Sequence, residues 1–195
     1  MTREERRSEK EEERRREELR LREEFVFAGP FDTNGVLYHI GTEWGTTDYQ
    51  NPHSRGHVVA NRSSNAAGTA EDFVGREKKA SYSQNAKGSW MSVDLGPTRR
   101  LQVRHYCLRH GHTYKHTVLR NWRFEGSNDG FSWSLLRQHD NDASMGSVPF
   151  GEGHWEVSNS LTYRYFRIFQ HGINSNGDYV LHCCGMELYG KLTVT

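Results

Sequence analysis

The chain has 195 residues, about the size of one domain or slightly more. Its 26 Lys and Arg nearly balance its 25 Asp and Glu, yet 19 of the first 24 residues are charged. No apolar run is long enough for a membrane-spanning helix, and the N-terminus lacks the apolar stretch of a secretory signal. We therefore expect a soluble, intracellular, cytoplasmic protein that does not insert into membranes.

Residues 1–24 form a charged arm in which Glu, Arg and Lys follow one another without Gly or Pro. These residues are strong helix formers, and acid-first pairs such as Glu11–Arg15 and Glu18–Arg22 each stabilise a helix by about 0.2–0.5 kcal/mol. Leu19 and Leu21 alone cannot make the apolar seam of a coiled coil. We predict a charged helix, either solvated or lying across a charged protein partner.

Residues 25–195 are predicted to form one domain, because short apolar or alternating runs are separated by clusters of Gly, Asn, Asp and Ser. The expected strands are Val36–Gly41, His57–Arg62, Trp90–Leu95, Leu101–Leu108, Asn121–Ser127, Trp133–His139, His154–Val157, Tyr163–Gln170 and Val180–Leu192. Residues Thr69–Val74 are expected to form a short helix. The expected core includes Trp90, Trp122, Phe124, Trp133, Phe166 and Ile168. Strands at this spacing indicate an all-β protein, built as an antiparallel sandwich or barrel.

An ordered series of motifs resembles the discoidin-like family, also called coagulation factor 5/8 type C or galactose-binding-like. The motifs are Asp32–Tyr38, Ile40–Thr42, Asn51-Pro52, Trp90–Gly96, Leu108–His110, Leu119–Gly130, Tyr165–Ile168 and Glu187–Gly190. The nearest resemblance is to the intracellular branch found in HECT-type ubiquitin ligases and plant BTB/POZ proteins. The resemblance implies an eight-stranded jelly-roll β-sandwich that binds ligands through loops at one end.

A long basic span lies inside the predicted domain. Between Asp94 and Glu125 there is no acidic residue, but there are seven Lys and Arg and four His. This span indicates an anionic ligand, which is an acidic peptide, a phosphate or an anionic glycan. In the alternative interpretation, strand alternation scatters these residues over both faces and neighbouring strands supply acids. Nucleic acid is not expected, because the net charge is only +1.

We expect the ligand-binding site in the loops Thr42–Asn51 and Arg109–Arg120. These loops combine flat aromatic rings with planar hydrogen-bond donors, which suits recognition by stacking and hydrogen bonding. The candidate site residues are Trp44, Asp48, Tyr49, Arg109, His110, His112, Tyr114, Lys115, His116 and Arg120.

The sequence leaves three function classes open. We favour a non-catalytic binding module that acts as a protein-interaction or adaptor subunit of a larger assembly, either linked to a ubiquitin ligase or part of a cytoskeletal or ciliary scaffold. The second class is an intracellular, lectin-like carbohydrate-binding domain. The third is a zinc-dependent enzyme using Cys107, His110, His112 and His116, but their spacing is not that of a zinc finger. We expect no metal, no cofactor and no catalytic residue.

Overall fold

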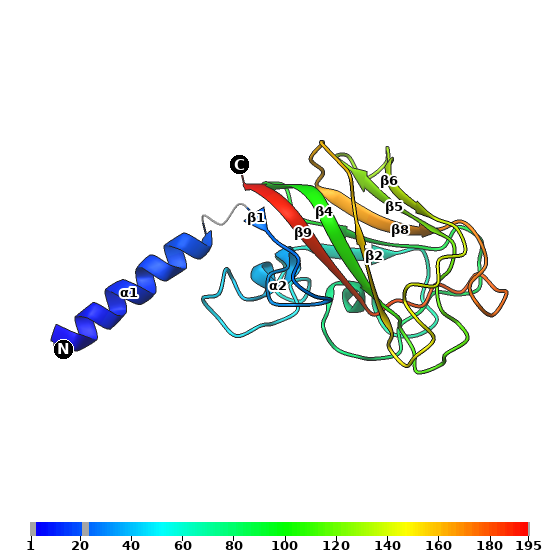
Figure 1. Cartoon of the computed structure of the whole chain (residues 1–195), viewed down its shortest axis with the longest axis horizontal. Coiled ribbons are helices and arrows are strands. Elements are labelled where there is room, and N and C mark those ends of the chain that lie inside the picture. Colours follow the sequence, from blue (N-terminus) through cyan, green and yellow to red (C-terminus); the bar gives the residue numbers. More distant parts are fainter. Residues whose placement is uncertain (1–2, 21–23, 195) are drawn as a thin grey trace.

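A computed structural model describes residues 3–20 and 24–194. Within these residues it contains two antiparallel sheets that pack face to face (Figure 1). The elements are α1 (Arg3–Arg20), β1 (Glu24–Phe25), α2 (Val36–Gly41), β2 (Val59–Arg62), the 3-10 helix η1 (Ala70–Val74), β3 (Trp90–Asp94), β4 (Arg99–Arg109), β5 (Trp122–Ser127), β6 (Ser134–His139), β7 (Glu152–Glu156), β8 (Tyr165–Gln170) and β9 (Gly185–Val194).

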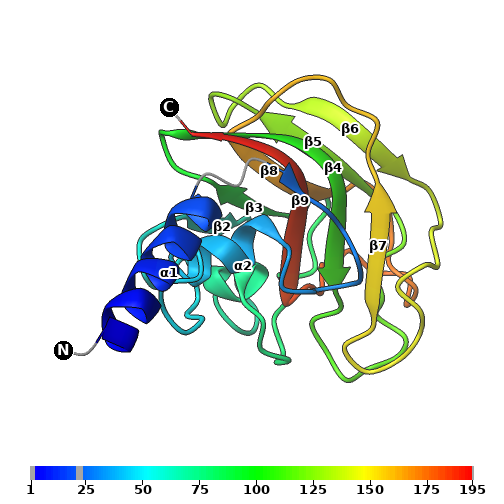
Figure 2. The same ribbon diagram turned by 60° about the vertical axis from the view of Figure 1, so that its left-hand side comes forward.

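One sheet has four strands in the order β1-β9-β4-β7, and the other has five in the order β2-β3-β8-β5-β6 (Figure 2). The expected all-β jelly-roll sandwich, preceded by a charged helix, is confirmed. The boundary between arm and domain at residue 24 stays a prediction. No described helix is both long enough and apolar enough to cross a membrane.

The core lies between the sheets, because successive residues of each strand point to opposite faces. In β3, Met91 and Val93 are fully buried, and Phe166 and Ile168 of β8 meet them from the neighbouring strand. Trp122 and Phe124 of β5 are equally buried, so these two and the two β8 residues confirm their expected core positions.

The core assignment is wrong for Trp90 and Trp133, which are only half-buried. Both line a hollow on the outer face of the five-stranded sheet. Trp90 alternates with the buried Met91, so it points to the outer face of β3. Apolar character alone does not tell which face of a sheet is the inner one.

The strand predicted at Val36–Gly41 is also wrong, because this segment is the helix α2. Its buried residues Val36, Leu37 and Ile40 follow helical spacing, and the carboxylate of Glu187 accepts the backbone N–H groups of Leu37 (2.8 Å) and Tyr38 (3.1 Å). A side chain at Gly35 would overlap this carboxylate. Burial raises the pKa of Glu187 to about 7.

Candidate ligand-binding surface at the loop end

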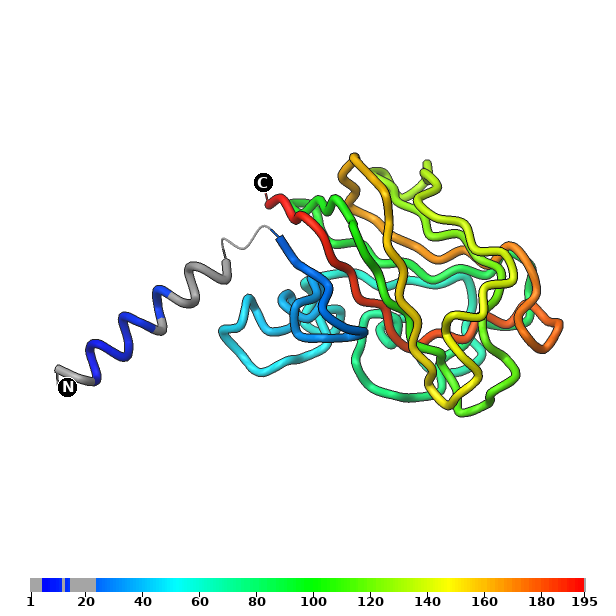
Figure 3. The backbone as a smooth tube through the Cα atoms, viewed as in Figure 1, coloured from blue at the N-terminus to red at the C-terminus, as the bar shows by residue number. Residues whose placement is uncertain are grey.

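Four loops meet at one end of the sandwich, opposite the C-terminus (Figures 1 and 3). They comprise residues 63–89, 110–121, 140–151 and 171–184. The antiparallel register brings them together, since Arg109 at the end of β4 pairs with both Glu152 and Gly185, where the neighbouring strands begin. We call this region the loop end.

A buried chain of hydrogen bonds ties one of these loops to the core. His139 lies between the hydroxyl of Tyr106 and the carboxylate of Asp142, at 2.7 Å from each. The indole N–H of Trp122 donates to the Tyr106 hydroxyl (3.1 Å), and that of Trp155 donates to Asp142 (3.0 Å). Loop 140–151 therefore starts from a rigid base.

Three rings on loop 110–121 form an exposed column. The ring centroids of His112 and Tyr114 are 3.8 Å apart, and those of Tyr114 and His116 are 5.6 Å apart. The backbone N–H of Tyr114 donates to Nδ1 of His112 (3.0 Å), which fixes the turn. Tyr114 is 54% exposed, and Lys115 and His116 are also exposed. The column offers flat surfaces beside one cation, an arrangement suited to stacking and charge-assisted contacts.

Buried rings support this column. Nε2 of His110 bonds the carbonyl oxygen of Tyr114 (2.8 Å). The ring of His182 lies 5.5 Å from that of His110 and 4.6 Å from that of Tyr82, which in turn lies 5.7 Å from His112. Burial lowers the pKa of His182 to about 3 and also lowers the pKa of His110. The supporting rings are therefore uncharged near neutral pH.

Arg109 lies below the surface and holds two segments together. It is 4% exposed, pairs with Glu152 at 2.8 Å and donates to the carbonyl oxygen of Arg76 at 2.9 Å. Its guanidinium also lies 4.0 Å from the ring centroid of Phe31. Every face of this side chain is occupied within the protein, so its contacts position loops at this end of the molecule.

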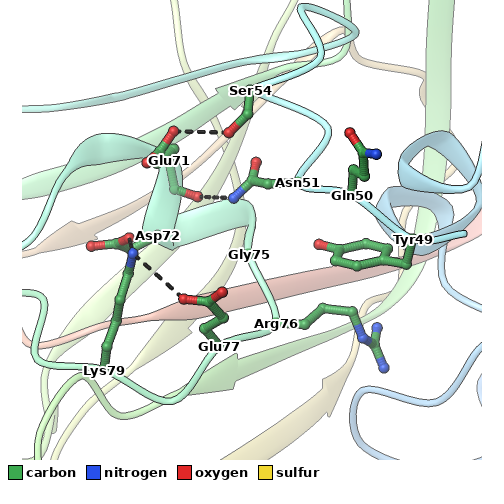
Figure 4. A pocket seen from close by; sticks show the side chains of 10 residues that line it. All are labelled: Tyr49, Gln50, Asn51, Ser54, Glu71, Asp72, Gly75, Arg76, Glu77 and Lys79. Atoms are coloured by element: carbon green, nitrogen blue, oxygen red, sulfur yellow. Dashed lines mark hydrogen bonds and ion pairs between the residues drawn. The ribbon is translucent and has the colours of Figure 1, made fainter.

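Tyr49 lines a separate hollow of about 460 Å³ (Figure 4). Its ring stacks on Tyr38 with 5.5 Å between centroids, and burial raises its pKa above the usual range. Three carboxylates line this hollow with two cations, and Lys79 lies 2.6 Å from Asp72 and 3.8 Å from Glu77. The hollow therefore offers no excess positive charge for an anionic ligand.

The structure brings together five of the ten candidate residues, and these are His110, His112, Tyr114, Lys115 and His116. Trp44 packs near Phe25 (6.3 Å between centroids), Asp48 is exposed on its own loop, and Arg120 donates to the carbonyl oxygen of Asp142 (3.2 Å). Tyr82 and His182 were not predicted from the sequence. They come from distant loops that meet in an isolated β-bridge, for which the sequence gives no local signal.

The zinc hypothesis gains no geometric support. Cys107 packs in a separate cluster with Phe31 and Tyr189, away from the histidines of the loop end. Among residues 3–20 and 24–194, no group of three or more His, Cys, Asp or Glu is placed to hold a metal ion. The three cysteines are free and buried, and burial raises the pKa of the Cys107 thiol to about 12.

The basic span is scattered, as in its alternative interpretation. Arg109 pairs with Glu152, and Arg123 pairs with Glu125 at 3.3 Å. Arg99 donates to the backbone oxygens of His57 and Leu95, and Arg100 to those of Pro97 and Arg99. Only Lys115 carries the basic character of this span onto the exposed column.

Comparison with known proteins agrees with this architecture. A carbohydrate-binding module from a family 31 glycoside hydrolase of Clostridium perfringens superposes with a TM-score of 0.57 and 16% identity, covering 73% of this chain and 100% of that chain. The fold is discoidin-like. The resemblance expected from the motifs is thereby confirmed. No protein-family model matches the chain.

Two curated proteins are similar in sequence to this discoidin-like chain. The E3 ubiquitin-protein ligase Ufd4 of Drosophila melanogaster is 32% identical over 182 residues, which is 86% of this chain and 6% of Ufd4. A BTB/POZ domain-containing protein of Arabidopsis thaliana is 30% identical over 176 residues, which is 82% of this chain and 21% of the plant protein. The chain thus spans only a small part of the length of each relative.

Proposed function

We propose that the chain is a non-catalytic binding domain that recruits an anionic peptide ligand to a ubiquitin-ligase assembly in the cytoplasm. The observation that carries the proposal is the exposed His112–Tyr114–His116 column on its buried support. Rings held in place before binding lose little conformational entropy when a ligand stacks on them. Lys115 beside the column supplies the charge for an acidic residue.

The link to ubiquitin ligases rests on the sequence similarity to Ufd4. Under this proposal, residues outside these 195 carry out ubiquitin transfer, and the discoidin-like domain supplies the contact to a substrate. The N-terminal helix α1, with its dense charge, is the proposed second contact to a protein partner. The alternative of a cytoskeletal or ciliary scaffold stays a prediction from the sequence.

The test uses affinity capture with the full chain as bait, followed by mass spectrometry and an assay for ubiquitin transfer in the captured material. Tyr114→Ala removes the central ring of the column. Leu161→Ala is the matched control, because Leu161 is also a large side chain, 61% exposed, on the loop between β7 and β8 at the other end of the sandwich.

We expect wild type and Leu161→Ala to capture the same substrate proteins together with ligase activity, and Tyr114→Ala to lose the substrates. Capture that is identical for all three baits contradicts the loop-end site. Capture without any ubiquitin-transfer activity contradicts the link to a ligase.

A glycan ligand is the second candidate, favoured by the carbohydrate-binding-module fold. Sugar rings stack on flat aromatic faces in the same way as peptide groups. Binding on a glycan array that is lost in Tyr114→Ala and retained in Leu161→Ala supports this candidate. An array without any binding removes it.

A further inference from the structure

The outer face of the five-stranded sheet carries a hollow of about 240 Å³ that the proposed function does not use. Asn61, Trp90, Ser92, Trp133, Tyr165 and Arg167 line it. Three of these six residues are aromatic and one is an arginine, although the hollow lies on the solvent side of the sheet. Trp, Tyr and Arg are the residues most enriched at the energetic centres of protein interfaces.

The register of the sheet explains the hollow. Ser92 lies at its centre, paired with Asn61 of β2 on one side and with Arg167 of β8 on the other. The same face of β3 carries Trp90 two residues before Ser92, and Tyr165 occupies the same face of β8 two residues before Arg167. A small side chain surrounded by large ones leaves a depression with aromatic walls.

Exposed apolar residues continue the surface beyond the hollow. Phe131 is 90% exposed, Leu135 55% and Val59 54%, and they lie on the β5–β6 hairpin and on the edge strands β6 and β2. Contiguous exposed apolar surface with a polar rim is typical of a protein interaction site.

The carboxylates of this face are already engaged. Asp94 accepts two hydrogen bonds from Arg164, at 2.5 and 2.6 Å. Glu125 accepts from Arg167 at 2.6 Å and lies 3.3 Å from Arg123. Three guanidinium groups thus face two carboxylates, and the surface has one excess positive charge.

The hollow also holds side-chain N–H groups, beside the hydroxyl groups of Ser92 and Tyr165, which can both donate and accept. Within the described part of the chain, no hydrogen-bond acceptor meets the indole N–H of Trp90 or Trp133, or the side-chain N–H groups of Asn61. Arg167 lies 4.1 Å from the ring centroid of Trp133 and uses only its Nε–H for Glu125. The partnerless N–H groups are matched by a ligand that presents acceptors and apolar surface.

We propose that this hollow binds an extended, proline-rich segment of a partner protein, with an acidic residue beside the prolines. Proline has a backbone carbonyl but no N–H, and its ring is apolar. A polyproline II helix exposes its carbonyls, and proline-rich segments dock in aromatic-lined grooves. The acidic residue matches the excess positive charge.

The test is a titration of the full chain with a peptide of eight prolines followed by two aspartates, monitored by NMR of the indole N–H signals. We expect the signals of Trp90 and Trp133 to shift. Those of Trp122 and Trp155 are internal controls, because they are bonded to Tyr106 and Asp142 beneath the surface. A peptide of alternating Gly and Ser followed by two aspartates is expected to cause no shift.

Two variants locate the site. Trp133→Ala removes an aromatic side chain that lines the hollow, and Ser92→Phe fills the centre of the hollow. Each is expected to weaken peptide binding about tenfold or more. Tyr114→Ala, at the loop end, is expected to leave it unchanged, so failure here and failure of the proposed function are distinguishable. Circular dichroism and thermal unfolding check that each variant is folded.

Several results would overturn the proposal. One is the absence of any shift with the proline peptide at millimolar concentration. Another is equal binding of the Gly–Ser peptide. A third is a shift of the Trp90 and Trp133 signals by oligosaccharides but not by the proline peptide, which would assign the hollow to a glycan.

Discussion

The exposed layer of the loop end and the buried layer at the adjoining ends of β4 and β9 hold their polar groups in different ways. Below the surface, Arg109, His110 and Glu187 are tied to backbone and side-chain groups of other segments. At the surface, Tyr114 and Lys115 are exposed to solvent. Buried polar groups are costly to leave unpaired, whereas exposed ones exchange their partners for water.

This contrast separates residues that maintain the fold from residues that can meet a ligand. Arg109 and His112 are only three positions apart, and the sequence predicts both as ligand contacts. The structure gives the first an ion pair and a carbonyl partner, but leaves the second half-exposed. Substitutions in the buried layer are therefore expected to change the free energy of unfolding, and substitutions in the exposed layer are expected to change ligand capture.

The largest expected effect is in the buried layer, at Glu187. Glu187→Ala leaves the N–H groups of Leu37, Tyr38 and Leu188 without their acceptor, and removes the partner of Arg76 at 3.4 Å. We expect a loss of about 3–5 kcal/mol in the free energy of unfolding, measured by urea denaturation. Glu77→Ala is the control, because its side chain is 84% exposed, and it is expected to cost less than about 0.5 kcal/mol. Equal effects of the two variants would contradict the structural role of Glu187.

The sequence predicts much of the sandwich and little of this layering. Alternation and turn residues define eight strands to within a few residues, since local chemistry determines both. The helix α2 escapes prediction because its N–H groups are capped by Glu187, about 150 residues away in sequence. Trp90 and Trp133 escape it because large apolar residues can line a surface hollow as well as a core. The support of the loop-end column by His182 also escapes prediction, because it depends on contacts between loops that are distant in the sequence.

A smaller effect is expected from protonation of His182. Its pKa falls from 6.5 to about 3 on folding because of burial, so the unfolded chain takes up a proton first as the pH decreases. The contribution of neutral His182 to stability is therefore complete above pH 6.5 and is lost as the pH falls toward 3. Between pH 7.5 and pH 5 the loss is about 2 kcal/mol.

His182→Phe isolates this contribution, because phenylalanine keeps a ring beside Tyr82 but does not titrate. Urea denaturation of both proteins at pH 7.5 and pH 5 is expected to show a smaller decrease for the variant. Parallel decreases would mean that His182 titrates normally in the folded protein. His171→Phe is the control variant, because it makes the same substitution at a histidine whose side chain is only partly buried.

The smallest effect on stability is expected in the exposed layer, at Tyr114. Tyr114→Ala removes a ring that is 54% exposed and whose backbone, not its side chain, bonds His110 and His112. We expect a change in unfolding free energy within about 0.5 kcal/mol, because surface substitutions away from buried networks rarely do more. If ligand capture is lost while stability is unchanged, the ring acts on the ligand directly. If stability falls by as much as in Glu187→Ala, the column is part of the fold, and the distinction between the two layers disappears.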